Sequence, residues 1–224
     1  MPVLKVYKMG LADYGRAYKF QEELLLQRIG REIPDSLLLL EHPPTLTIGK
    51  EGDLENLLVS GNELKKRGIA LFPVDRGGSI TWHGPGQLVG YPILDLRERD
   101  RDIRKFIDAL EEVIIRTLAD LSIQSTRDDE HVGVWVGQEK IAAIGVRINR
   151  WVTKHGFALN VNNDLSHFSL INPCGITDRG VTSIVKLLGR DVSMETVTEK
   201  LLINFSDVFE YELDIAARST DDLL

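Results

Sequence analysis

The chain has 224 residues, of which 43% are hydrophobic and 27% charged, a composition ordinary for a soluble globular protein. Its formal net charge of −7 argues against general nucleic-acid binding, and its apolar runs, such as residues 37–40 and 88–94, are too short to span a membrane. The N-terminus lacks the long apolar segment of a secretory signal, and the single cysteine, Cys174, cannot form an internal disulfide. We therefore expect a cytoplasmic protein.

The first half of the chain alternates short apolar runs with segments of helical spacing. Strands are predicted at 3–7, 36–41, 45–48, 70–74 and 88–94, and helices at 13–31, 53–58 and 61–67. The dipeptide Pro43-Pro44 ends the second strand, because proline cannot donate to a β-ladder. Gly68 is the expected C-cap of the third helix.

The second half begins with the clearest helix, at 102–121. Apolar residues mark one face, and the charged residues Arg104, Lys105, Glu111, Glu112 and Arg116 mark the other. A hairpin (132–136 and 140–148), a strand (152–161) and a last helix (193–211, with Ser193 as N-cap) follow, and 164–180 show little periodicity. The irregular interleaving predicts an α/β (α+β) fold with a mixed sheet flanked by helices. We expect one domain over 1–215 and a flexible tail over 216–224.

Residues 76–87 form a glycine-rich stretch between two apolar runs. Four glycines surround a cation, a hydroxyl, an imidazole and an amide, contributed by Arg76, Thr81, His83 and Gln87. A long connector would have such glycines, but a connector does not need these polar groups. The alternative is a loop between two core strands that cradles a ligand.

Cys174 is a candidate nucleophile, because it lies in the polar sequence Asn172-Pro173-Cys174-Gly175. A lone cytosolic cysteine is also often a small buried hydrophobe. A working cysteine needs a base or cation nearby; the candidates are His83, His155, His167 and Lys140. Lys140 begins an otherwise apolar strand, where it is either a solvated strand end or a partly buried amine whose pKa is lowered toward a value useful for proton transfer.

No cofactor is indicated. The five histidines are far apart, without His-x-His or HExxH spacing and without a second cysteine, so no metal site is predicted. The stretch that begins at Arg76 lacks the Gly-Lys-Ser/Thr ending of a P-loop.

Taken together, these motifs resemble the lipoyl(octanoyl) transferase family over about residues 36–180. The specific signature is Arg76-Gly77-Gly78-x-x-Thr81-Trp82-His83-x-x-Gly86-Gln87-x-x-x-Tyr91-Pro92. Weaker blocks occur in the family's order: Glu41-His42-Pro43-Pro44, Thr47-Ile48-Gly49, Lys140-Ile141-Ala142-Ala143-Ile144-Gly145, His155-Gly156-Phe157-Ala158-Leu159-Asn160 and Asn172-Pro173-Cys174-Gly175.

The resemblance implies a fold similar to the catalytic domain of biotin and lipoate protein ligases. It also implies that Cys174 takes octanoate from acyl carrier protein as a thioester, and that a lysine of a lipoyl domain then attacks to give an amide. Lys140 pairs with the cysteine in this family, and His83 is expected to position rather than to act as the base. The implied substrate-binding residues are Arg76, Gly77, Gly78, Ser79, Ile80, Thr81, Trp82, His83, Ala143, Ile144, Gly145, Gly156, Phe157 and Ala158.

The expected partners are octanoyl-acyl carrier protein as donor, and lipoyl domains of 2-oxoacid dehydrogenase complexes and glycine cleavage H protein as acceptors. The protein is expected to be a monomer. Because these partners are usually acidic, we expect a local basic edge formed by Arg76, Arg147, Arg150 and Lys154. Two alternatives remain: an ATP-dependent lipoate or biotin protein ligase, and a non-catalytic module that binds an acyl carrier.

Overall fold

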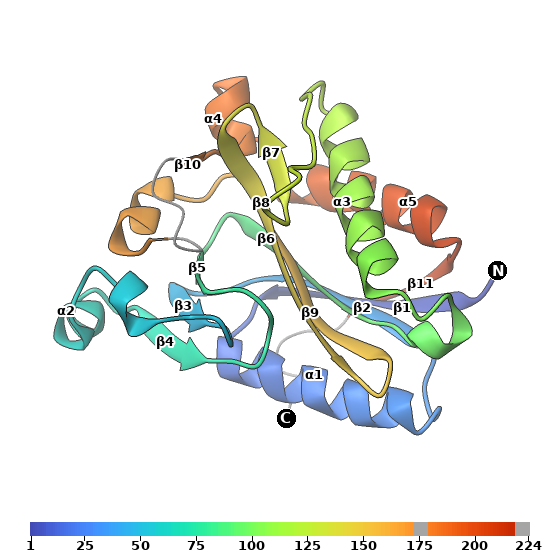
Figure 1. Cartoon of the computed structure of the whole chain (residues 1–224). Coiled ribbons are helices and arrows are strands. Elements are labelled where there is room, and N and C mark those ends of the chain that lie inside the picture. The colour runs from blue at the N-terminus through green and yellow to red at the C-terminus, as the bar shows by residue number, and fades with distance from the viewer. Residues whose placement is uncertain (173–178, 218–224) are drawn as a thin grey trace.

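The computed structural model describes residues 1–172 and 179–217, and Figure 1 shows a twisted sheet with helices on both faces. The strands are β1 Val3–Leu11, β2 Asp35–Glu41, β3 Thr45–Ile48, β4 Ala70–Pro73, β5 Ile80–His83, β6 Gln87–Ile93, β7 Val134–Val136, β8 Glu139–Asn149, β9 Val152–Asn160, β10 Gly180–Val181 and β11 Glu212–Ala217. The α-helices are α1 Tyr14–Ile29, α2 Gly61–Lys66, α3 Ile103–Ala119, α4 Ile184–Leu188 and α5 Met194–Phe209, and the 3₁₀ turns are η1 Leu54–Asn56, η2 Leu96–Glu98 and η3 Leu165–Leu170.

The larger sheet has the order β10-β8-β9-β6-β2-β1-β11, with β7 paired to β8. Strand β1 runs parallel to β2 and β11, and β8 runs parallel to β10, whereas the other pairs are antiparallel. A smaller sheet has the order β4-β3-β5. The predicted mixed sheet is therefore confirmed.

Both faces of the larger sheet are covered, and β2 shows why. Leu37 packs into the core beneath α3 and α5, while the next residue, Leu38, packs into the core beneath α1. Successive strand side chains point to opposite faces, so a run of leucines produces a strand that is buried on both sides. Figure 1 shows α1 along one face and α3 with α5 along the other.

The long helices begin at side chains that cap them. Asp13 accepts a hydrogen bond from the Arg16 N–H at the start of α1, and Asp102 accepts one from the Lys105 N–H at the start of α3. Ser193 caps α5 as the sequence predicted. None of the helices in the described ranges is long and apolar enough to cross a bilayer.

Several short elements differ from the expectation. The stretch 76–87, expected as one loop, contains β5, which pairs with β3 to complete the smaller sheet. The helix expected at 53–58 is only the 3₁₀ turn η1, and α4, β10 and β11 lie where no element was predicted. Strand β11 runs two residues into the tail expected from 216, while residues 218–224 lie outside the described ranges. The single-domain assignment stays a prediction.

Candidate functional site

Two segments that the sequence singled out lie opposite each other in neighbouring strands. In the β8–β9 ladder Ala143 faces Ala158, and Gly145 faces Gly156. The glycine-rich stretch joins them, because the Gly77 N–H donates to the Val146 carbonyl of β8 over 3.0 Å. Segments about seventy residues apart in the chain therefore meet at one place on the sheet.

A cavity of about 630 Å³ opens at this meeting point. Thirteen of the fourteen predicted substrate-binding residues line it: Arg76, Gly77, Gly78, Ser79, Ile80, Thr81, His83, Ala143, Ile144, Gly145, Gly156, Phe157 and Ala158. Trp82 does not; its side chain is buried in the core of the smaller sheet and stacks on His167 with ring centroids 4.3 Å apart. A substrate contact for each of the fourteen stays a prediction.

The buried side chain of Arg76 holds the first part of the stretch against β3. One guanidinium nitrogen, Nη2, donates to both the carbonyl and the Oγ1 of Thr47, each over 2.9 Å. A Cβ on Gly49 would lie 2.2 Å from the Gly78 carbonyl oxygen, so only glycine permits this approach. The Thr47-Ile48-Gly49 block of the sequence thus packs against the first residues of the glycine-rich stretch and fixes their position.

His83 is neutral and is hydrogen-bonded at both ring nitrogens. Nδ1 lies 2.9 Å from Gln87 Oε1, and Nε2 lies 3.4 Å from Thr47 Oγ1. The Gln87 oxygen can only accept, so Nδ1 carries the proton and Nε2 accepts from the hydroxyl. Burial holds the pKa of His83 well below its usual value. This arrangement agrees with a positioning role. It does not favour a role as the base, because both ring nitrogens of His83 already have hydrogen-bond partners.

An ion-pair cluster around Asp75 supports the start of the glycine-rich stretch. Asp75 Oδ1 lies 2.9 Å from Lys154 Nζ and 2.9 Å from His155 Nε2. The hydrogen bond from His155, followed by that from Lys154, lowers the pKa of Asp75. Burial lowers the pKa of His155 despite this partner, whereas the carboxylates of Glu22 and Asp75 outweigh burial at Lys154 and raise its pKa.

The expected basic edge is wrong in two of its four members. Lys154 is 1% exposed and paired with Glu22 and Asp75, and Arg76 is 8% exposed. A cation that is buried in this way cannot meet an acidic protein surface. Of the four, only Arg147, near Asp75, and Arg150 remain at the surface.

Lys140 stands half-buried at the start of β8. Its Nζ donates to the Val132 carbonyl over 3.0 Å and lies 4.7 Å from the centroid of the Trp135 ring. The residue is thus neither fully exposed nor buried, and the lowered pKa that one of the two alternatives required stays a prediction. Lys140 also lines a second, smaller cavity of about 40 Å³, which shares Thr81, Ala143 and Ala158 with the first. Cys174 lies outside the described residues.

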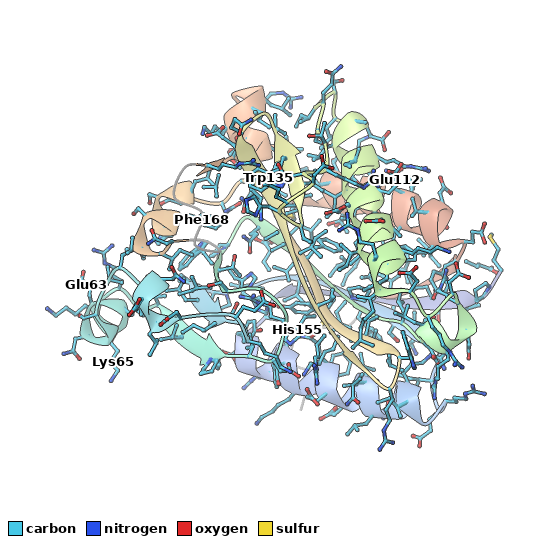
Figure 2. All side chains as sticks on the ribbon, in the orientation of Figure 1. Glu63, Lys65, Glu112, Trp135, His155 and Phe168 are labelled. Carbon is cyan, nitrogen blue, oxygen red and sulfur yellow. The ribbon has the colours of Figure 1, made fainter. Side chains whose placement is uncertain are left out.

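Figure 2 labels Trp135, which belongs to β7, and His155, which belongs to β9. These labelled residues mark the two parts of the site, because Lys140 lies against Trp135 and the larger cavity extends to His155. Of the other histidines named as partners for the cysteine, His167 lies against Trp82 and lines neither cavity.

Sequence reasoning did not assign two tyrosines to the site. Tyr14, at the start of α1, and Tyr91, on β6, both line the larger cavity. Burial raises the pKa of each phenol, so both stay neutral near pH 7. The Tyr91 hydroxyl meets His42 Nε2 at 2.8 Å, and burial lowers the pKa of His42 to about 4. Tyr91 belongs to the family signature, but nothing in the sequence separates Tyr14 from an ordinary helix-face residue.

Among residues 1–172 and 179–217, no group of three or more His, Cys, Asp or Glu side chains is arranged to hold a metal ion. The described polar groups that line the larger cavity are guanidinium, imidazole, hydroxyl, amine, amide and carboxylate groups, and its two carboxylates, Glu51 and Glu130, belong to no such group of three.

Comparison with known proteins decides the family. Residues 13–206 match the family model of the lipoyl protein ligase A/B catalytic domain. The chain belongs to this family. Within it, the chain is 49% identical to octanoyltransferases from Desulforamulus reducens, over 95% of this chain and 93% of that one, and from Caldicellulosiruptor bescii, over 96% and 95%.

Solved structures show the same fold as this lipoyl protein ligase A/B catalytic domain. A bi-partite lipoate protein ligase from Thermoplasma acidophilum superposes with a TM-score of 0.75 at 19% identity, covering 100% of this chain and 91% of that one. A biotin protein ligase from Aquifex aeolicus superposes with a TM-score of 0.54 at 14% identity, covering 94% and 70%. At these identities the likeness shows the fold alone, and it confirms the predicted similarity to biotin and lipoate ligases.

Proposed function

We propose that this protein is an octanoyltransferase, which moves an octanoyl group from a carrier-protein thioester to a lysine of a lipoyl domain. The observation that carries the proposal is the 49% identity to octanoyltransferases over nearly the whole length of both chains. The cavity supports it, because 630 Å³ lies within the range of about 300–1,000 Å³ typical of small-molecule sites.

In the first step, the Cys174 thiolate attacks the thioester carbonyl. A C–S bond to the cysteine forms, the C–S bond to the carrier's thiol breaks, and the released thiolate takes up a proton. The products are an octanoyl-Cys174 thioester and a free carrier thiol. The family resemblance supports this role for Cys174. One thioester replaces another, so the step needs no ATP.

In the second step, the ε-amine of the acceptor lysine attacks the octanoyl-Cys174 carbonyl. An amide forms, the cysteine leaves as a thiolate, and the attacking amine loses its proton. Lys140 is the proposed group for this proton transfer, because its amine stands where the two cavities share lining residues. If Lys140 and Cys174 exchange a proton, their titrations are coupled and the apparent pKa values belong to the pair.

The larger cavity is the proposed site for the acyl chain. Its β8–β9 wall includes two small residues, Ala143 and Ala158, which face each other. The other wall contains Gly77, where a Cβ would meet only the Val146 carbonyl oxygen, at 3.6 Å. An extended hydrocarbon chain would lie beside Gly77 and would contact apolar lining residues such as Ile144 and Phe157.

The proposed donor is octanoyl-acyl carrier protein. The proposed acceptors are the lipoyl domains of 2-oxoacid dehydrogenase complexes and glycine cleavage H protein. Both steps pass the acyl group directly between covalent carriers, so each partner must reach the same cavity in turn.

The test is intact-protein mass spectrometry after mixing the protein with octanoyl-acyl carrier protein, without ATP. We expect a mass increase of one octanoyl group on the wild type and none on Cys174→Ala. Addition of a lipoyl domain should then move that mass to the domain. Transfer that requires free octanoate and ATP, and that survives Cys174→Ala, would show a ligase instead. Carrier binding without any adduct would show a non-catalytic module.

A further inference from the structure

Glu111 lies on the face of α3 that the sequence predicted to be polar, yet it is 2% exposed. Its carboxylate reaches across to the connection between α3 and β7. Oε1 accepts the Gly133 N–H over 2.9 Å, and Oε2 lies 3.3 Å from Arg127 Nε. One buried carboxylate therefore binds both ends of the segment 127–133. We call this segment the lysine loop, because its Val132 carbonyl accepts a hydrogen bond from Lys140.

The lysine loop is closed at its base. Thr126 and Trp135 exchange two backbone hydrogen bonds, of 2.8 and 2.9 Å, across the bridge where β7 begins. Arg127 also donates to Glu112 and to the Asp108 carbonyl of α3. The loop is thus attached to α3 at its first residue by several contacts, but at its last residue by Glu111.

The last two residues of the loop hold the amine of Lys140. The Val132 carbonyl accepts from Lys140 Nζ over 3.0 Å. Gly133 has φ +131°, where other residues are strained, and its absent Cβ would lie 3.3 Å from Lys140 Cε. The stem of the lysine therefore passes directly over the peptide that Glu111 fixes.

We propose that Glu111 is a positioning residue for the Lys140 amine, which it orients through the Gly133 N–H and the Val132 carbonyl. The proposal deepens the proposed function and rests on it, because it assigns a purpose to a fixed amine beside the transfer site. Glu111 itself touches no substrate.

The carboxylate suits this place better than any neutral residue. The Glu111 side chain faces an N–H group on one side and a guanidinium on the other. Both are donors, and the two oxygens of a carboxylate can accept from both. An amide at this position can still accept from Gly133, but it turns an NH₂ group toward Arg127. Alanine loses both contacts and leaves the Gly133 N–H unsatisfied.

The experiment compares Glu111→Ala with Glu112→Ala. Glu112, labelled in Figure 2, is the next residue of α3 and also pairs with Arg127, but it makes no contact with Gly133. We expect Glu111→Ala to lower kcat for octanoyl transfer about tenfold or more with an unchanged KM for the donor, because the acyl site is intact while the amine is misplaced. Glu112→Ala should keep the wild-type kcat, and Glu111→Gln should lie between the two.

A second readout does not depend on activity. Lys140 is labelled with acetic anhydride at a low ratio, and its labelling rate is measured by peptide mass spectrometry against that of the exposed Lys105. We expect faster labelling of Lys140 in Glu111→Ala and the wild-type rate in Glu112→Ala. If Glu111→Ala does not fold, Glu111→Gln is measured in its place; it turns an NH₂ group toward Arg127 and should move both readouts in the same direction by a smaller amount.

The outcomes separate the two ideas. Wild-type protein that transfers no octanoyl group overturns the proposed function, while the labelling still tests the positioning. Active wild type together with wild-type kcat and wild-type labelling in the folded variant overturns the positioning alone. An equal loss in Glu112→Ala also overturns it, because that change leaves the Gly133 contact in place.

Discussion

His155 Nε2 donates to Asp75 Oδ1 over 2.9 Å, and this bond ties the middle of β9 to the residue before the glycine-rich stretch. His155 adopts φ +60° inside the strand, a conformation that costs free energy outside glycine. Its backbone N–H donates a hydrogen bond to Gln21 Oε1 of α1 over 3.0 Å. Helix, strand and loop therefore jointly fix one imidazole at the wall of the cavity.

Asp75→Asn should destabilise the protein mainly through Lys154. The ammonium of Lys154 pairs with two carboxylates, those of Glu22 and Asp75, and Lys154 is 1% exposed. The substitution removes one of these two negative charges. We expect a loss of about 2 kcal/mol in urea unfolding at pH 7, less than for a fully buried pair because the Asp75 side chain is 38% exposed and water screens it. The matched control is Arg147→Gln, whose exposed pairing with Asp75 should contribute less than about 0.5 kcal/mol.

The pH dependence of that difference follows from the lowered pKa of Asp75. A carboxylate with a depressed folded pKa stabilises above its unfolded value of 3.8, and this stabilisation is lost as the pH falls below it. The difference between wild type and Asp75→Asn should therefore shrink on going from pH 5 to pH 3. A difference that stays constant would show that the charge of Asp75 is not responsible.

Gly77→Ala should change substrate preference without changing stability. The new Cβ would lie in the cavity and meet only the Val146 carbonyl oxygen, at 3.6 Å. We expect a melting temperature equal to wild type and a raised KM for octanoyl donors, with shorter acyl donors less affected. Steady-state kinetics with acyl chains of different length measure this.

Gly156→Ala is the contrasting variant. Its Cβ would lie 2.2 Å from the Gly90 carbonyl oxygen of β6, an overlap that only backbone movement can relieve. We expect a loss of about 3 kcal/mol or more, measured by urea unfolding. If both variants behaved alike, the distinction between a glycine that leaves room for ligand and one that leaves room for a neighbouring strand would be wrong.

Thr47→Val keeps the shape of the side chain but removes a hydroxyl shared by Arg76 and His83. Two buried polar groups each lose a partner, so we expect a loss of about 1–3 kcal/mol and a lower transfer rate. Thr45→Val, two residues earlier on β3, removes a hydroxyl that bonds only the Pro43 carbonyl and should leave transfer unchanged. Transfer at the wild-type rate in Thr47→Val would contradict a role for this hydroxyl at the site.

Stability should fall as the pH drops from 6.5 to 4, partly because of His42. Burial lowers the pKa of this imidazole from 6.5 to about 4, so the unfolded chain binds a proton in this range while the folded protein does not. The expected loss from His42 between pH 7 and pH 5 is about 2 kcal/mol. In His42→Gln the curve of unfolding free energy against pH should be shallower by this amount; an unchanged slope would assign the effect to other groups.

The sequence predicted the main elements of the fold because their patterns are long. The apolar stripe of α3 runs along a helix of 17 residues, and leucines fill the middle of β2, a strand of 7 residues; both elements were assigned correctly. Strand β10 has two residues and α4 has five, too few for periodicity to register. Strand β11 was not predicted either. It contains the charged residues Glu212 and Asp214, and it forms by pairing with β1, which lies two hundred residues earlier in the chain.

The site shows the same division. Residues in contiguous signatures, such as the stretch that begins at Arg76, were found because family motifs are read along the chain. Glu111 was misplaced on a polar face, because its partners Arg127 and Gly133 come from a later loop. A carboxylate at the edge of an apolar stripe looks the same in sequence whether it faces water or a backbone N–H.

The pairing of β1 with β11 has a consequence for synthesis of the chain. Val3 aligns with Glu212 and Lys8 with Ala217, so the first strand made receives its outer neighbour from the last strand described. Until that happens, one edge of β1 keeps unpaired backbone donors and acceptors that can join another chain. A nascent or truncated product lacking residues 212–217 should therefore aggregate through its N-terminal strand, while its cavity, built from β8, β9 and the glycine-rich stretch, is already encoded.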